Sequence, residues 1–221
     1  GTLALTAANT FTGGVSITAG TLALTNSNQL AAANTINIGA GGKLSTNTGG
    51  VTFAQSLAGG GTYDITSTGE VRYSGDWSAF TGTVNVLTSG GGKINLTAAT
   101  HVPPAASAVF NIPAGGSFFT ANNLAFSNSF SVAGTGNTEN RGAIRLESGS
   151  SINGPITLTG NATFGNSSAA GVIATVSGTL TEKSPEQIVL QTDGGVGYAI
   201  QVPLGVFERL PATGGRCTLF T

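Results

Sequence analysis

The sequence predicts an all-β protein, built as a parallel β-helix followed by a small, incomplete β-barrel with one short helix. Three observations support this prediction. The string Gly-Thr-Leu-Ala-Leu-Thr at residues 1–6 returns letter for letter at residues 20–25, an offset of 19. Short alternations of apolar and polar residues recur between glycines, and 35 of the 221 residues are Gly, roughly twice the usual share. Many sharp turns must therefore separate short strands.

The alternations in the first part have the period of two that buries one face of a strand. Strands this short cannot bury a face alone, and their recurrence at roughly 20-residue spacing predicts turns stacked above and below one another. An antiparallel sandwich is the alternative that the same strands could form. The alternating pairs are Leu22/Leu24, Ile36/Ile38, Val51/Phe53, Tyr63/Ile65, Val84/Val86, Ile94/Leu96, Phe110/Ile112, Ile144/Leu146 and Ile156/Leu158.

The composition excludes several classes of function. Charged residues make up 8% of the chain, and 8 Lys and Arg against 9 Asp and Glu leave a net charge of -1, which does not support a general phosphate-binding surface. One Cys permits no internal disulfide, and one His with one Cys cannot make a structural zinc site. We therefore expect no catalytic, cofactor or metal site. The absence of Met and of a signal sequence indicates a fragment of something longer.

A change in composition near residue 171 predicts a boundary between two modules. The first 171 residues carry 5 acids and 5 bases, whereas the last 50 carry 4 acids and 3 bases. At the same point a segment rich in Asn, Thr, Ser and Gly is followed by one that contains three prolines. We place the boundary at residues 170–172, with domains at residues 1–171 and 172–221.

The second module reads as a small barrel of the OB type that lacks its last strand. Strands are expected at residues 172–180, 187–192, 196–202 and 216–220, with a polar turn at 182–185 and a hairpin turn at Asp193-Gly194. Leu204, Phe207 and Leu210 are expected on one side of a short helix that ends at Pro211.

Several polar residues are candidates for a functional site. Asp64, Glu70 and Asp76, close to Tyr73 and Trp77, are the best candidate for a carbohydrate or metal patch, although a solvated insertion loop is favoured. The glycines before Lys43 and Lys93 are interpreted as turns before strands, because Leu44 and Ile94 stand where a phosphate loop needs Ser or Thr.

The remaining polar residues are expected to be structural. Glu139, Arg141, Arg145 and Glu147 are interpreted as exposed ion pairs of little energetic value. His101 is assigned a surface or turn position, and Cys217 is expected to be an inert, partly buried thiol.

The first module resembles the repeat of autotransporter passenger domains. The resemblance is close over residues 1–24. Residues 25–171 share only its general pattern of Asn-x-hydrophobic strands and Gly turns. It implies a right-handed β-helix displayed outside the cell and an outer-membrane β-barrel translocator as partner in the full protein. The residues that match the repeat are Gly1, Thr2, Leu3, Asn9, Thr10, Gly13, Gly14, Gly20, Thr21 and Leu22. Stacked Thr and Asn side chains are expected to form hydrogen-bonded ladders.

The second module resembles the amino-terminal OB domain of the RuvA family, which binds Holliday junctions. The resemblance implies a tetramer, a four-way DNA junction and a RuvB-type motor as partners of a complete protein. This chain stops before the acidic pin and lacks the helix-hairpin-helix domain of the family. The matching residues are Gly178, Glu182, Lys183, Pro185, Gly194, Gly195, Val196, Gly197, Tyr198 and Pro203.

Two hypotheses follow, and they conflict on compartment. In the first, the chain is a non-enzymatic fragment of an exported, surface-displayed or adhesive β-helix, and its truncated RuvA-like module neither binds junctions nor forms a tetramer. In the second, the chain is a RuvA-type junction-binding subunit of DNA repair and recombination with a β-rich extension, and it is cytoplasmic. A mis-joined reading frame or a fusion is the origin we favour.

Overall fold

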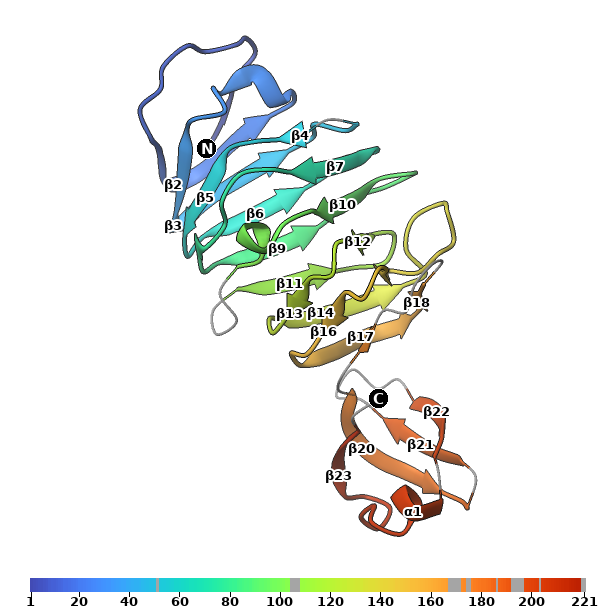
Figure 1. Ribbon diagram of the computed structural model, residues 1–221. Coiled ribbons are helices and arrows are strands. Elements are labelled where there is room, and N and C mark those ends of the chain that lie inside the picture. The colour runs from blue at the N-terminus through green and yellow to red at the C-terminus, as the bar shows by residue number, and fades with distance from the viewer. Residues whose placement is uncertain are drawn as a thin grey trace.

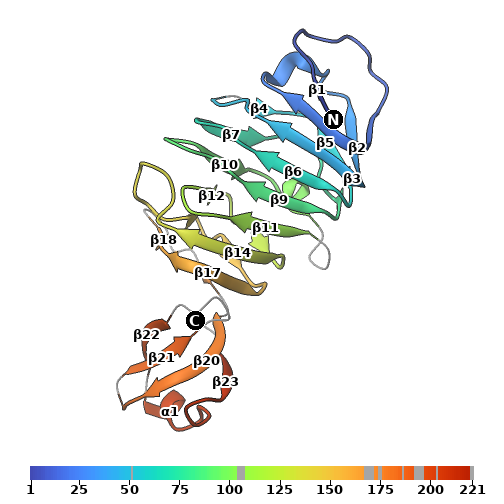
Figure 2. The ribbon, with the colours of Figure 1, turned by 180° about the vertical axis from the view of Figure 1, so that it is seen from behind.

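The computed structural model describes residues 1–50, 52–103, 108–166, 172–173, 176–185, 187–191, 197–202 and 204–219. The first part of the chain forms a parallel β-solenoid of about eight turns, shown as stacked arrows in Figures 1 and 2. The strands of the solenoid pair in parallel wherever their register is given, which confirms the solenoid and excludes the antiparallel sandwich.

The largest sheet has ten strands and forms one side of the solenoid. Each turn contributes a strand that pairs with the equivalent strand one turn before and one turn after. Its strands, in spatial order, are β1 (Thr2–Ala4), β2 (Val15–Leu24), β3 (Thr35–Thr46), β6 (Thr62–Ile65), β9 (Thr83–Val86), β11 (Val109–Ile112), β14 (Ser129–Gly134) and β17 (Ile156–Ala162), with β5 (Ser56–Gly59) and β8 (Ala79–Phe80) off this path.

Two further parallel sheets complete the cross-section. The second sheet comprises β4 (Thr52–Phe53), β7 (Glu70–Tyr73), β10 (Lys93–Leu96), β12 (Phe118–Thr120), β15 (Ile144–Leu146) and β18 (Phe164–Gly165). The third comprises β13 (Ala125–Phe126), β16 (Ser151–Ile152) and β19 (Val172–Ile173). Single turns of 3₁₀-helix lie at Ser27–Gln29 and Ala99–His101.

One continuous apolar core runs through the solenoid. The residues of the predicted alternating pairs that can be described are all buried, from Leu22 to Leu158; Val51 lies outside the described residues. Two aromatic clusters lie within this core, and their rings meet mostly edge to face. The first joins Phe53, Tyr63, Tyr73, Trp77 and Phe80, and the second joins Phe110, Phe118, Phe126 and Phe130.

Polar side chains form a ladder along the outer face of the largest sheet, as expected. Asp64, Asn85 and Asn111 stand in register on consecutive strands. Asn85 donates to Asp64 at 2.7 Å, Asn111 donates to Asn85 at 2.9 Å, and the Lys43 ammonium caps the column at 2.7 Å from Asp64. Each side chain meets its neighbour because the parallel register places the three residues at the same position along successive strands, although 21 and 26 residues separate them in sequence.

The second part is a four-stranded antiparallel sheet with one short helix. Its strand order is β22 (Gly197–Gln201), β21 (Gln187–Gln191), β20 (Val176–Lys183) and β23 (Arg216–Leu219), with α1 at Leu204–Phe207. Leu180, Ile188 and Leu219 are buried, and Phe207 and Leu210 pack against them. Leu204, expected on the same side, is 63% exposed, because it begins the helix and the core packs against Phe207 at the helix end and against Leu210 beyond it.

Two predictions in this region, one of a strand and one of a turn, are wrong in detail. The strand expected at residues 172–180 is two strands in two sheets, since β19 pairs with β16 of the solenoid and β20 begins at Val176. The boundary at residues 170–172 stays a prediction. The polar turn expected at 182–185 begins only after Lys183, because a bulge at Thr181 extends β20 and turns Lys183 toward the interior.

Candidate functional site

The two copies of the repeated string stack directly on each other. β1 pairs with the second half of β2 in a register that sets each residue of one copy on the same residue of the other, for example Thr2 on Thr21. The Thr21 N–H donates to the Gly1 carbonyl at 2.9 Å. Gly20 has a φ of +75°, and a Cβ there would lie 2.6 Å from the Gly1 oxygen. The corner of the repeat therefore requires glycine.

The other repeat-motif residues lie around this end of the solenoid. Leu22 is buried, whereas Leu3 is 62% exposed because no strand of the described chain covers β1. The Asn9 amide donates to the carbonyls of Ala7 and Gln29, each at 2.9 Å, and so ties the loop after β1 to the next turn. The exposed part of the same loop contains Thr10, Gly13 and Gly14.

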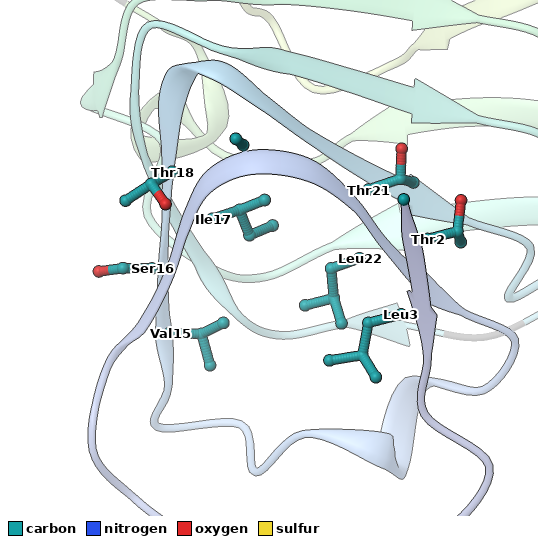
Figure 3. Close-up of a pocket in the computed structure, with 10 residues that line it drawn as sticks. Thr2, Leu3, Val15, Ser16, Ile17, Thr18, Thr21 and Leu22 are labelled. Atoms are coloured by element: carbon teal, nitrogen blue, oxygen red, sulfur yellow. The ribbon is translucent and has the colours of Figure 1, made fainter.

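Of the repeat-motif residues, Gly1, Thr2, Leu3, Thr21 and Leu22 border a hollow of about 430 Å³ at the N-terminal end, shown in Figure 3. One wall is β1, and the other is the first half of β2, from Val15 to Ala19. The side chains of Val15, Ile17 and Leu3 make the lining largely apolar, and it carries no charged side chain.

A charged ladder lies on the outer face of the second sheet. We use this name for Glu70, Arg72, Lys93, Glu139, Arg145 and Glu147. Lys93 lies 3.5 Å from Glu70 and 2.5 Å from Glu139, and Arg145 lies 3.1 Å from Glu139. Arg145 also pairs with Glu147. The centre of the Phe119 ring lies 5.5 Å from the Lys93 Nζ and 4.6 Å from the Arg145 Cζ.

These ion pairs are not the exposed pairs that the sequence indicated. The side chains of Lys93 and Arg145 are each only 12% exposed, and that of Glu147 is 9% exposed. They are sheltered because the parallel stacking brings residues from different turns onto one column, where the Phe119 ring covers them. Burial alone would raise the pKa of Glu70, but hydrogen bonds from Asn95 and Arg72 and the charge of Lys93 outweigh it and hold this pKa below the ordinary value.

The loop between β14 and β15 is fastened to the ladder. Glu139 supplies the ion pairs, and the Asn137 amide donates to the carbonyls of Gly91 and Gly92, at 3.2 Å each. The Thr138 N–H donates to the Gly90 carbonyl at 2.9 Å. The loop thus joins turns that are 46 residues apart in sequence.

The predicted acidic patch does not form. Asp64 belongs to the polar ladder of the largest sheet, Glu70 lies on the second sheet, and Asp76 caps a turn by accepting from the Ser78 N–H at 2.7 Å. Tyr73 and Trp77 are fully buried, so neither can stack on a sugar, and the residues lie in the body of the solenoid rather than in an insertion loop. Within the described residues no cluster of three His, Cys, Asp or Glu could hold a metal ion.

His101, Cys217 and the glycine motifs have structural positions. His101 lies in a turn, as predicted, but is 4% exposed, and its Nδ1 accepts from the N–H groups of Thr97 and Ala98; burial lowers its pKa. Cys217 is half-buried, and burial raises the pKa of its thiol. The glycines before Lys93 form a turn as predicted, whereas those before Lys43 lie inside β3, where the chain bends at a corner.

The RuvA-like motif residues that the structure describes lie on or beside the small sheet. Gly178 is buried in β20, where a Cβ would lie 2.5 Å from the Gln191 carbonyl oxygen. Lys183 donates to the Leu210 carbonyl at 2.9 Å, and its ammonium lies 4.8 Å from the centre of the Phe207 ring. Glu182 and Pro185 are exposed, and Gly197 and Tyr198 lie in β22. Gly194, Gly195, Val196, Pro203 and the predicted Asp193-Gly194 turn lie outside the described residues.

Comparison with known proteins finds a different relative for each part, and both resemblances drawn from the residues are confirmed. Residues 1–24 match the passenger-associated-transport-repeat family, and residues 173–221 match the RuvA N terminal domain family. No solved structure gives a significant match. No helix of the described chain is both long and apolar enough to cross a bilayer.

Curated relatives match the last part of the chain. Among them are the Holliday junction branch migration complex subunits RuvA of Chromobacterium violaceum, Aromatoleum aromaticum and Bordetella pertussis. Over 50 residues, or 23% of this chain, the identities are 50%, 52% and 48%. The match covers 25%, 25% and 26% of those proteins, so the chain spans about a quarter of their length. The chain therefore joins a passenger-type repeat in a β-solenoid to a segment similar to the start of RuvA.

Proposed function

We propose that the chain is a non-enzymatic fragment of an exported passenger protein, whose β-solenoid serves surface display and adhesion. The observation that carries the proposal is the exact repeat stacked on itself in register, Thr2 on Thr21, within the segment that matches the passenger repeat. A solenoid gains stability turn by turn from its neighbours. It can therefore grow into a long, protease-resistant stalk without a catalytic centre.

The placement of polar groups supports a structural role. Lys43 and the amides of Asn85 and Asn111 are engaged in the polar ladder, and Lys93 and Arg145 in the charged ladder. These side chains hold neighbouring turns of the solenoid together, so their role is to stabilise the fold. The partner implied by this proposal is an outer-membrane β-barrel translocator.

A display experiment tests the proposal. The chain is placed between a signal peptide and the translocator of a known autotransporter, and protease treatment of intact cells measures the surface-exposed fraction. We expect display of the wild-type solenoid and of Gly13→Ala, where a Cβ meets nothing within 4 Å. Gly42→Val, whose Cβ would lie 2.0 Å from the Ile17 carbonyl oxygen, should be displayed poorly or degraded. Retention of wild type and Gly13→Ala inside the cell would contradict export.

RuvA-type junction binding is the second candidate, favoured by the identity of about half over the last 50 residues. It would give the chain a four-way junction and a RuvB-type motor as partners, in the cytoplasm. Two features weigh against it. Residues 172–221 carry 3 basic residues against 4 acidic ones, too few cations to release many counterions. Lys183, moreover, is turned inward to the Leu210 carbonyl.

A gel-shift titration separates the two candidates. The purified chain is mixed with a synthetic four-way junction and with a linear duplex of equal length at about 100 mM salt. We expect no submicromolar binding that prefers the junction, and no tetramer in sedimentation. Tight binding selective for the junction would establish the second candidate instead.

A further inference from the structure

Two 3₁₀ turns of the solenoid, at Ser27–Gln29 and Ala99–His101, are closed in the same way by the side chain of their last residue. The Oε1 of Gln29 accepts from the backbone N–H groups three and four residues before it, at 3.1 and 2.7 Å. The Nδ1 of His101 accepts from the N–H groups at the same two offsets, at 3.1 and 3.2 Å. We call these side chains the amide cap and the imidazole cap.

The two caps also share their remaining contacts. The Gln29 Nε2 donates to the Leu5 carbonyl, and the His101 ring forms a hydrogen bond with the backbone of Ser74, in each case one turn earlier in the solenoid. Each cap also meets the hydroxyl of the Thr four residues before it, at 3.2 Å for Gln29 and 3.4 Å for His101. Both caps are 4% exposed. Glutamine and histidine therefore do the same structural work at two equivalent corners.

Only the imidazole cap can change its charge between mildly acidic and neutral pH. Because Nδ1 accepts two N–H groups, the neutral ring carries its proton on Nε2, the nitrogen left to donate to Ser74. A second proton must go to Nδ1, where it points at the N–H groups of Thr97 and Ala98. Both hydrogen bonds are then lost, and donors face a donor. The amide cap has no such protonated form at these pH values.

The surroundings of His101 do not compensate for this loss. Burial lowers the pKa of His101, and the hydrogen bond to Ser74 and the charge of Asp76 offset this only in part. Asp76 is the one charged residue in segment 74–80 of the preceding turn. Residues 97–103 and 121–128, which are joined by the bond from the Asn128 amide to the Pro103 carbonyl, contain no Asp, Glu, Lys or Arg.

We propose that His101 is an acid-sensitive cap, whose protonation opens the turn at residues 97–101 while the equivalent turn at Gln29 stays closed. The Thr100 carbonyl in this turn accepts from the Trp77 N–H at 2.7 Å, so opening loosens the chain beside the first aromatic cluster. The folded pKa lies below the unfolded value of about 6.5. The stabilisation is therefore present above about pH 6.5 and is lost as the pH falls through the folded pKa. This inference lies outside both proposed functions.

Hydrogen exchange of four backbone amides tests the proposal in the intact chain. Thr97 and Ala98 report the imidazole cap, and Thr25 and Asn26 report the amide cap in the same molecule. The single His gives one imidazole signal in NMR spectra, which locates its pKa directly. Once this signal has titrated, the protection factors of Thr97 and Ala98, corrected for the intrinsic pH dependence of exchange, should have fallen at least about fivefold. Those of Thr25 and Asn26 should change by less than about twofold.

Two reciprocal variants exchange the caps. His101→Gln places at this corner the side chain that the equivalent corner already uses. It should keep the two amides beneath it protected at neutral pH and remove the effect of acid on them. Gln29→His should make the two amides at its own corner acid-sensitive. Where a variant does not fold, the two pairs of amides in the wild-type chain decide the question by themselves.

Three results would each overturn the proposal. The first is an imidazole that titrates at or above about pH 6.5. The second is a loss of protection on acidification that is equal at both corners, or absent from Thr97 and Ala98. The third is the same loss in His101→Gln as in wild type, because the effect would then belong to Asp76, the other titratable group at this corner.

Discussion

Tyr63 holds the middle place in a chain of three buried hydroxyl groups, and its removal should cost more than removal of its neighbour. Its hydroxyl lies 3.0 Å from the Thr46 Oγ1 and 2.9 Å from the Tyr73 hydroxyl. All three side chains are fully buried. Tyr63→Phe removes both contacts, whereas Tyr73→Phe deletes the same atom but leaves Tyr63 bonded to Thr46.

The magnitudes follow from these contacts. A neutral hydrogen bond contributes about 1 kcal/mol net, and a buried polar group left without a partner costs about 1–3 kcal/mol. Tyr73→Phe should therefore lower the free energy of unfolding by about 1 kcal/mol. Tyr63→Phe strands the hydroxyls of both Thr46 and Tyr73, and it should lower the same free energy by about 2–4 kcal/mol.

Trp77 provides a local probe for this measurement. It is the single Trp of the chain, and its ring centroid lies 5.7 Å from that of Tyr63 and 4.6 Å from that of Tyr73. A solenoid can unfold in stages, so Trp fluorescence during guanidinium unfolding reports the turns that contain the hydroxyl chain. Equal destabilisation of these turns by Tyr73→Phe and Tyr63→Phe would contradict a central role of the Tyr63 hydroxyl, since the two variants differ only in the number of partners lost.

Three further predictions concern the ladders and the corners. The pKa of Glu70 is held below its unfolded value, so the ionised carboxylate stabilises the fold above about pH 4.3, and this stabilisation disappears as the pH falls through the folded pKa. Acid unfolding of Glu70→Gln should therefore depend less on pH than that of wild type. Glu139→Gln should cost about 1 kcal/mol or less because the carboxylate is 35% exposed, and the difference from wild type should vanish at about 1 M salt; a difference that persists there would contradict an ionic role. Gly42→Ala should cost about 2 kcal/mol or more by thermal unfolding, since its Cβ collides with the Ile17 backbone of the preceding turn, whereas Gly13→Ala should stay within about 0.5 kcal/mol of wild type. Equal melting temperatures would contradict the close packing at the corner.

The local pattern of the sequence was enough to predict the solenoid and its core. An exact repeat can stack in register only if each copy occupies the same place in successive turns, and the pairing of β1 with β2 does this. The inward residues were predictable for the same reason, because alternation within one strand decides which side chains face inward. Leu22, Ile36 and Leu96 are all buried as the pattern required.

Which polar groups meet was decided by the tertiary structure alone. Lys93 and Glu139 pair across 46 residues of sequence, and no local pattern encodes the loop that brings them together. The same holds for His101, whose burial depends on the turn that folds over it, and for Lys183, which a one-residue bulge turns inward. The alternation of apolar residues and the positions of the glycines are local properties that a sequence carries directly. Contacts between turns depend instead on how loops of unequal length bring residues that are distant in sequence side by side.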